Sequence, residues 1–342
     1  MADIEFQTPH MRVVANPDLG AEITHLGGGD GANLLYMGQW KTPLRASESY
    51  SYGSQLLDWL SEYRGGWQEL FPNAGGAGEV LGVPIPFHGE VSRARWPWHW
   101  ITPGTHAVMS CPARLPLVLE REMRLDPDRP VLSIEERVTS EVAFAVPYIW
   151  GHHPAWGPPL AEPGARIDLP GGRVVADAGM DGPAVDLAPL SEHAWPIATG
   201  RQGEAIDLSV IPAAPRQRLC FISELAAGWY AIRNPENGIG LAVAWDLDVM
   251  PCLWFWQEIG GGQGMPWYGR AAITALEPNV QWPSHGLAQA QQAGTARLLQ
   301  PGRVDRFKLT VALFKASERP VASVGLDGSI KLVESLPRFS GH

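Results

Sequence analysis

The chain has 342 residues, of which 45% are hydrophobic and 18% charged, a composition that suits a large core and excludes a disordered protein. A formal net charge of −10 argues against partners such as nucleic acid or anionic membranes and favours a small, weakly charged ligand. The longest apolar runs fall far short of the roughly 18 residues that cross a bilayer as a helix.

The three cysteines, Cys111, Cys220 and Cys252, have no metal-binding spacing and lie beside apolar residues, which predicts buried free thiols. The first ten residues lack the basic and apolar regions of a secretory signal. Free thiols suit a reducing compartment, so we expect a cytoplasmic protein.

Alternation with a period of two residues dominates the chain and predicts strands. In chain order, residues 15–26 predict a hairpin and residues 51–63 are the best candidate for a short helix. Residues 115–125 predict a strand in which Arg121 is the one charged exception on an otherwise apolar face. Residues 131–138 predict a weaker strand, joined to the previous one through a turn at residues 126–128.

Residues 230–245 predict a hairpin, because the pair Asn237-Gly238 separates two β-prone runs. Residues 306–314 alternate as a further strand, and the tail after Lys315 predicts a peripheral one. Many strands joined by Gly/Pro turns indicate an all-β sandwich or barrel with few short helices. Without an internal repeat or a low-complexity linker, we expect a single domain over residues 1–342, in which 157–215 is a loop-rich insertion.

Two glycine-rich stretches, 27–31 and 260–264, lack the lysine of a phosphate-binding loop and do not begin a helix after a strand. We interpret both as flexible turns. Residues 64–100 combine many polar and aromatic side chains without a period. This segment is either a surface loop with buried aromatic anchors or a functional loop on a β scaffold. Within it, His88 precedes Gly89, which permits a close approach of backbone or ligand.

The stretch "WGHHPAWG" (150–157) places two adjacent histidines among tryptophans. Pro154 favours an extended backbone at the preceding residue, and neighbouring side chains of an extended segment point to opposite faces. His152 and His153 therefore cannot chelate one metal ion together, and we predict no metal site. At 275–278, the sequence "ALEP" places Glu277 at the end of an apolar strand, where burial needs partners.

Taken in order, "FPNAG" (71–75), "HGE" (88–90), "HHPAW" (152–156), the 234–245 hairpin and "ALEP" (275–278) resemble the aldose 1-epimerases, or galactose mutarotases. The likeness extends over about residues 10–315. It implies a β-supersandwich that binds a small-molecule carbohydrate in an open cleft on a concave sheet, without a cofactor, as a monomer or homodimer.

The resemblance also implies roles for individual residues. Glu277 matches the family's catalytic base, and His153 the acid that protonates the ring oxygen from the other side of the sugar. His88 and Asn73 match substrate-binding residues, and we expect His152 to support the site from behind its neighbour.

The chain departs from the family pattern at three places. Ala74 stands where an arginine is usual, and Glu90 stands where a second glycine is usual. The segment 218–221 lacks the aspartate that the family has there. Asp246 is a candidate to replace this aspartate and bind sugar hydroxyls.

Three other functions remain open at this point. The first is that of a non-catalytic sugar-binding or regulatory protein on the same fold. The second is that of a hydrolase or lyase that uses Glu90 and Glu277 as paired carboxylates. The third is the binding of a phosphorylated or acidic sugar, which would require some of four arginines to lie close together. These are Arg64, Arg93, Arg95 and Arg270.

Overall fold

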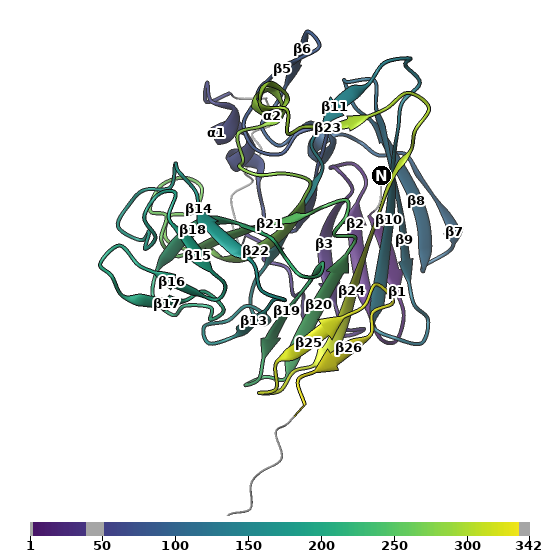
Figure 1. Cartoon of the computed structure of the whole chain (residues 1–342). Coiled ribbons are helices and arrows are strands. Elements are labelled where there is room, and N and C mark those ends of the chain that lie inside the picture. Colours follow the sequence, from purple (N-terminus) through teal and green to yellow (C-terminus); the bar gives the residue numbers. More distant parts are fainter. Residues whose placement is uncertain (1–2, 39–50, 335–342) are drawn as a thin grey trace, which may run out of the picture.

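The computed structural model describes residues 3–38 and 51–334 and shows two large antiparallel sheets, one of 12 and one of 8 strands (Figure 1). In spatial order, the 12-stranded sheet contains β1 (Ile4–Gln7), β2 (Arg12–Asn16), β3 (Glu22–Gly27), β4 (Trp67–Leu70), β12 (Gly151–Trp156), β22 (Ala272–Asn279), β21 (Cys252–Ile259), β18 (Arg216–Ser223), β14 (Arg173–Ala176), β15 (Glu192–Ala194), β16 (Ile197–Thr199) and β17 (Ala205–Asp207). The eight-stranded sheet contains β13 (Arg166–Asp168), β19 (Trp229–Asn234), β20 (Ile239–Trp245), β24 (Asp305–Lys315), β10 (Val131–Thr139), β9 (Val118–Leu125), β8 (His106–Pro112) and β7 (Trp98–Thr102).

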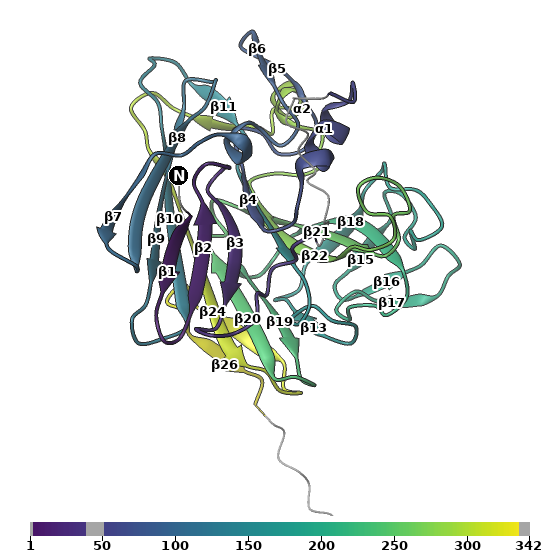
Figure 2. The ribbon, with the colours of Figure 1, turned by 180° about the vertical axis from the view of Figure 1, so that it is seen from behind.

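The remaining elements are short. They are the strand pairs β5 (Gly78–Val80) with β6 (Val83–Ile85), β11 (Val146–Tyr148) with β23 (Arg297–Leu299) and β25 (Val321–Val324) with β26 (Ile330–Leu332), the helices α1 (Gln55–Glu62) and α2 (Leu287–Ala293), and the 3-10 turn η1 (Val91–Arg93). Figures 1 and 2 place α1, α2, β5 and β6 together at one end of the sandwich. None of the helices in the described residues has the length and apolar character needed to span a membrane.

The predicted strands, hairpins and helix are confirmed. The 230–245 hairpin pairs Asn234 with Ile239 across its turn, and β2 and β3 form the hairpin expected near the N-terminus. Helix α1 begins after Ser54, whose hydroxyl accepts a hydrogen bond from the Leu57 amide at 3.4 Å. The loop-rich 157–215 segment supplies β13 to the smaller sheet, and β14 to β17 extend the larger sheet at one edge.

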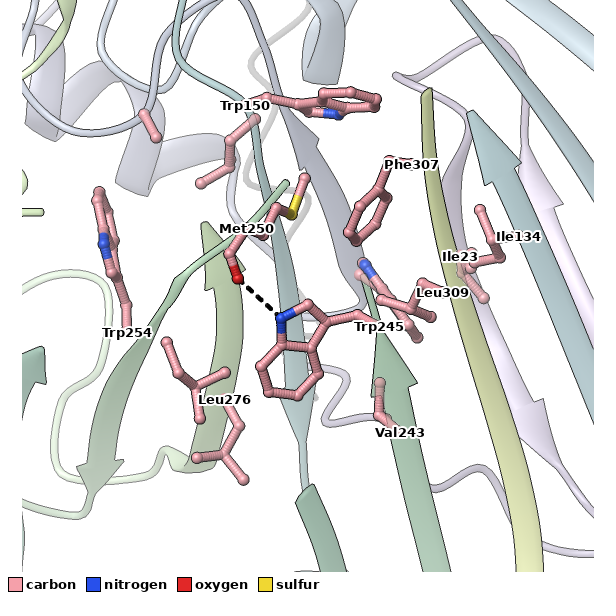
Figure 3. Close-up of a cluster of buried hydrophobic side chains, with 14 of the residues drawn as sticks. Ile23, Ile134, Trp150, Val243, Trp245, Met250, Trp254, Leu276, Phe307 and Leu309 are labelled. Atoms are coloured by element: carbon pink, nitrogen blue, oxygen red, sulfur yellow. Dashed lines mark hydrogen bonds between the residues drawn. The ribbon is translucent and has the colours of Figure 1, made fainter. Parts of the chain in front are cut away.

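The core lies between the two sheets and is built from the apolar faces that the alternation predicted. Figure 3 shows part of this core, to which the larger sheet contributes Ile23 of β3 and Leu276 of β22, and the smaller sheet Ile134, Val243 and Leu309. The indole N–H of a buried tryptophan, Trp245, donates to the carbonyl of Met250 at 2.9 Å, which satisfies a polar group that the core would otherwise leave unpaired (Figure 3).

Candidate active site

The two adjacent histidines of β12 point to opposite faces of the large sheet, as predicted. His152 lies opposite Glu69 of β4 and His153 opposite Gln68, so the pairing fixes which side each ring faces. His152 points between the sheets, where it meets residues of β10, whereas His153 lines a cavity on the other face. One strand thus serves the core and a candidate site at once.

The cavity has a volume of about 320 Å³ and is bounded by α1, by the loop between β4 and η1, and by strands β12, β18, β21 and β22. Its polar side chains are His88, His153, Gln217, Glu258, Glu277 and Ser284. Its aromatic side chains are Trp59, Phe87, Trp254, Trp256 and Trp267. Neither lysine nor arginine lines it within the described residues. Flat aromatic walls with a few convergent polar groups suit the C–H faces and hydroxyls of a sugar.

His153 and Glu277 meet at this cavity, with His153 Nε2 at 3.6 Å from Glu277 Oε1. Their exposed fractions are only 4% and 2%. Burial raises the pKa of Glu277 well above its ordinary value and lowers the pKa of His153 to about 4. Both shifts favour the uncharged forms, in which Glu277 holds the one proton of the pair. The two groups lie side by side, whereas we expected them on opposite sides of the sugar.

His88 stands beside this pair, with its ring centroid 5.6 Å from that of His153. Its Nδ1 accepts a hydrogen bond from the Gly75 amide at 2.9 Å, so in the neutral ring the proton is on Nε2. Burial first, and the nearby His153 second, lower the pKa of His88 well below its ordinary value. The neutral imidazole is thus oriented by the backbone as a hydrogen-bond donor.

His88 has a φ of 62° and Gly89 a φ of 73°, both in the left-handed region. A Cβ on Gly89 would lie 2.2 Å from the carbonyl oxygen of Phe71, so only glycine fits this turn. We expected a backbone or a ligand to approach Gly89 closely, and it is the backbone of Phe71 that does so. The long 64–100 segment is both an anchor and a contributor to the cavity, because it buries Trp96 in the core and supplies His88.

Helix α1 covers the histidines with Trp59. The indole ring lies 4.7 Å from the ring of His88 and 5.5 Å from that of His153, in edge contacts with both. Tyr63, just after the helix, packs on His153 at 5.5 Å. These apolar contacts exclude water from the imidazoles, which is the physical cause of their low pKa values.

Asn73 does not line the cavity, although we predicted that it binds substrate. Its amide nitrogen donates to the carbonyls of Gly76 and Pro86, each at 2.9 Å, and its oxygen accepts from the Leu287 amide at 2.7 Å. Every hydrogen-bonding group of the side chain is therefore engaged with backbone. Asn73 joins the His88 loop to the start of α2 and positions the site without contacting a ligand.

Three further candidate residues lie outside the cavity. Asp246 lies in the turn after β20 of the other sheet and accepts a hydrogen bond from the Asp248 amide, so it does not reach the cavity. His152 is fully buried on the opposite face of β12 and does not contact a ligand in the cavity. Glu90 accepts a hydrogen bond from the Arg114 amide at 2.6 Å and also lies outside the cavity, so it is not paired with Glu277.

The four arginines considered for an anion site do not converge. Arg93 pairs with Glu62 of α1 at 3.3 Å, and Arg95 pairs with Asp18 at 3.0 Å. Arg270 lines a separate hollow near Tyr36, and Arg64 does not line the cavity. A phosphorylated sugar would therefore find no cationic partner among the described cavity residues.

Behind His153, a cluster of four buried ionisable side chains joins the sheets, and sequence reasoning missed it as a unit. Arg121 of β9 donates to Glu69 of β4 and, at 2.6 Å, to Glu136 of β10. His152 lies 3.2 Å from Glu69 and 3.1 Å from Glu136. All four side chains have exposed fractions of 3% or less. A charge buried to this degree is tolerated only when it is paired.

The pKa directions in this cluster follow from the pairing. Burial alone would lower the pKa of His152 and raise that of Glu136, but the opposite charges outweigh it: the pKa of His152 rises, and that of Glu136 falls to about 2. Burial and the neighbouring Glu136 raise the pKa of Glu69 to about 7. The cluster thus combines two cationic and two acidic side chains, of which Glu69 is the carboxylate that takes up a proton most readily as the pH falls.

Glu69, Glu136 and His152 also bring ligand atoms within 4.8 Å of one another, the spacing of a metal site. The guanidinium of Arg121 already binds both carboxylates, so a cation of this protein occupies the position that a metal ion would need. The donor set therefore fits an internal ion cluster better than a metal centre.

We interpreted the glycine-rich stretch 260–264 as a flexible turn, but its backbone is held in place by hydrogen bonds. Glu258 Oε1 accepts hydrogen bonds from the amides of Gly261 and Gly262, at 3.1 and 2.8 Å, and Oε2 accepts one from Gln217 at 2.7 Å. A Cβ on Gly262 would lie 2.7 Å from the Trp267 ring. The loop is thus held by a buried carboxylate, and glycine is required for its close packing.

Comparisons with known proteins identify the fold. No family model matches the sequence, and no curated protein sequence matches it. Among solved structures, Slr1438 of Synechocystis sp. PCC 6803 is similar with a TM-score of 0.65 and 14% identity, over 92% of this chain and 96% of that one. A candidate aldose 1-epimerase from Escherichia coli K12 has a TM-score of 0.62 and 13% identity, over 92% and 99%. A galactose mutarotase related enzyme from Lactobacillus acidophilus has 0.62 and 12%, over 93% and 99%.

These likenesses, together with the two antiparallel sheets, show a galactose mutarotase-like fold. The fold class that the motif order predicted is confirmed.

Proposed function

We propose that the protein is an aldose 1-epimerase, which interconverts the α and β anomers of a sugar by opening and closing its ring. The observation that carries the proposal is the His153–Glu277 pair, two buried ionisable groups whose nearest side-chain atoms lie 3.6 Å apart at an aromatic cavity. The similarity to galactose mutarotase-like structures supports it at the level of the fold.

Ring opening needs a base for the C1 hydroxyl proton and an acid for the ring oxygen. Both oxygens are bonded to the same carbon, so an acid and a base that lie side by side, as His153 and Glu277 do, can reach one oxygen each. Transfer of the shared proton from Glu277 to His153 gives a carboxylate base and an imidazolium acid. Glu277 then takes the hydroxyl proton while His153 protonates the ring oxygen, the C1–O5 bond breaks and a C1 carbonyl forms.

Rotation about the C1–C2 bond presents the other face of the carbonyl to the C5 hydroxyl. Ring closure then reverses these two proton transfers and leaves Glu277 as a carboxylate and His153 as an imidazolium, and return of the proton from His153 to Glu277 restores the resting pair. Because the catalytic groups end as they began, the cycle consumes no co-reactant. In this scheme the Nε2–H of His88 donates a hydrogen bond near the ring oxygen, and Trp256 lies under the sugar.

Hydrolysis by paired carboxylates has weaker support. The second cavity carboxylate is Glu258, which lies four residues along β21 from Trp254, the ladder partner of Glu277. At about 3.3 Å per residue, the two backbone positions are ~13 Å apart, more than the roughly 6.5–9.5 Å of an inverting carboxylate pair. Both oxygens of Glu258 are also engaged with the glycine loop and Gln217.

The test is anomer exchange, followed by proton NMR for glucose, galactose and other aldoses, with the wild type and Glu277→Gln. We expect acceleration by the wild type and a loss of roughly 10²–10⁴-fold in the variant, the range of general acid–base catalysis. Glu79→Gln, an exposed carboxylate on β5, is the matched control and keeps wild-type activity. Absence of acceleration for every aldose would refute the proposal, and full activity of Glu277→Gln would refute the role of that residue.

A second candidate is a non-catalytic sugar-binding protein on the same fold. It is favoured by the near-complete burial of the pair, which leaves its polar atoms little exposed to a ligand. Titration of tryptophan fluorescence with the same sugars separates the two. Saturable binding without anomer exchange would support the second candidate.

A further inference from the structure

The cavity has a second polar end, remote from the proposed catalytic pair. Glu277 lies opposite Trp254 in the β21–β22 ladder, and Glu258 lies four residues further along β21, about 13 Å away at the rise of a strand. Gln217 of β18 lies opposite Glu258 in the neighbouring ladder. Both ends line the same cavity, which is therefore longer than one pyranose ring.

An aromatic floor connects the two ends. The ring of Trp256 lies 5.6 Å from that of His153 and 5.7 Å from that of Trp267, so the three rings form a continuous row along the cavity. Trp256 is half-buried and offers a face to a ligand. Sugar rings stack on such surfaces through their C–H faces, and Trp267, which lines the cavity beyond Trp256 with 8% of its surface exposed, is the next ring in this row.

The polar groups at the second end accept hydrogen bonds. Glu258 is nine-tenths or more buried and lines the cavity, and among the described residues its carboxylate is bound by amide N–H groups and by no cation. Oε2 receives one bond, from Gln217, and Gln217 keeps its own amide oxygen for a further donor. Burial raises the pKa of Glu258. Hydroxyl groups of a ligand would supply the missing donors, whereas an anionic substituent would be repelled.

We propose that Glu258, Gln217 and Trp267 form a distal subsite that binds an uncharged second sugar unit, so that the preferred substrate is a reducing disaccharide. The proposal rests on the epimerase function, because it places the reducing ring at His153 and Glu277. The second sugar unit, at Glu258, Gln217 and Trp267, does not contact the catalytic pair.

Glucose and cellobiose test the subsite, because both present the same reducing ring to the catalytic pair. We measure kcat/KM for anomer exchange by proton NMR and binding by tryptophan fluorescence. The wild type is expected to prefer cellobiose by about 10-fold or more, and glucose 6-phosphate to be a poorer substrate than glucose. Equal values for glucose and cellobiose would overturn the proposal.

Glu258→Gln removes the charge and keeps the shape, because the Gln217 amide can rotate to restore their hydrogen bond. We expect this variant to lose most of the cellobiose preference through KM while its glucose kinetics stay near wild type. Trp267→Leu, which shortens the aromatic floor, is expected to do the same, and Glu79→Gln serves as the control.

An equal loss for both sugars in Glu258→Gln and Trp267→Leu would show a merely structural role and overturn the subsite. If no sugar undergoes anomer exchange, the epimerase proposal fails, but the binding titrations still decide the subsite: cellobiose must bind more tightly than glucose, and Glu258→Gln must remove the difference.

Discussion

The two adjacent histidines of strand β12 lie in opposite electrostatic environments on its two faces. On the core side, His152 meets Glu69 and Glu136, which are themselves bound by Arg121, so that two basic side chains face two acidic ones. On the cavity side, His153 meets Glu277 and aromatic rings, and Glu277 Oε2 has no hydrogen-bond partner among the described residues.

The difference shows what separates a structural ion cluster from a candidate catalytic pair. Both histidines are buried, yet the pKa of His152 is raised by its carboxylates and that of His153 is lowered to about 4 by burial. Burial alone therefore carries no functional information. What distinguishes the cavity side is the lack of a lysine or arginine beside Glu277 among the described cavity residues, so that a proton is free to move when a ligand supplies polar partners.

The core side is expected to respond most strongly to mutation. Arg121→Met removes the only guanidinium among the four cluster residues and leaves two buried carboxylates facing one histidine. Breaking a buried ion pair in this way costs about 3–5 kcal/mol of unfolding free energy. Denaturant titration of the variant measures the loss.

Arg137→Met is the matched control, because Arg137 follows Glu136 on β10 but points to solvent, where it pairs with Glu120. Its unfolding midpoint should stay close to that of the wild type. A wild-type midpoint for Arg121→Met would mean that the cluster is not ionised, and the contrast between the two faces would disappear.

Exchanging each histidine for asparagine gives a crossed result. His152→Asn loses the partner of both carboxylates and should lower the unfolding free energy by about 1–3 kcal/mol, with near-normal turnover per folded molecule. His153→Asn should lower kcat by roughly 10²-fold or more and change stability less. Both kcat and the unfolding free energy should be measured for both variants. If kcat fell in proportion to the loss of unfolding free energy in each, His152 would not be structural and His153 would not be catalytic in the way proposed.

Much of this contrast was present in the sequence. The proline after His153 predicted that the two rings face apart, and the alternation of 115–125 isolated Arg121 as a charged residue on an apolar face. The same reasoning applied to 131–138 would have placed Glu136 on the face of Leu132 and Ile134. The pairing of these residues with Glu69 could not be predicted, because it depends on how two sheets pack.

The failed site predictions have a similar cause. Asn73 was assigned from a motif, but its amide is engaged with a helix that begins more than 200 residues later, at Leu287. Asp246 was taken from the next hairpin in the sequence, and that hairpin belongs to the other sheet. Glu258 went unassigned because nothing local shows that it binds the glycines that follow it. Strand identity and facing direction are local properties, whereas partners are not.

A smaller effect is expected at the distal end of the cavity. In Gly262→Ala, the added methyl group meets the Trp267 ring and Glu258 at less than 3 Å. Overpacking of this kind costs about 1–3 kcal/mol, unless the loop moves. Gly264→Ala, in the same loop but without close neighbours, is the control. Thermal unfolding of both variants checks the prediction, and equal midpoints would show that Glu258 does not hold the loop in place.

The pH dependence of anomer exchange is the mildest test of the cavity side. The pair works with one proton, so activity falls when it holds two or none. Because the pKa of His153 is about 4, the second proton binds only below about pH 4, and because burial raises the pKa of Glu277, the last proton leaves only well above the ordinary range of a carboxyl group. Beyond either limit, kcat/KM should change tenfold per pH unit, about 1.4 kcal/mol.

A profile of kcat/KM against pH should therefore show a plateau that includes pH 5 to 6. An acid limb centred near 6.5, the pKa of an exposed imidazole, would mean that His153 is open to water and that the contrast with His152 is smaller than the structure indicates. His152→Asn should leave the acid limb in place, because His152 and its carboxylates lie on the other face of β12 and do not contribute to the lowered pKa of His153.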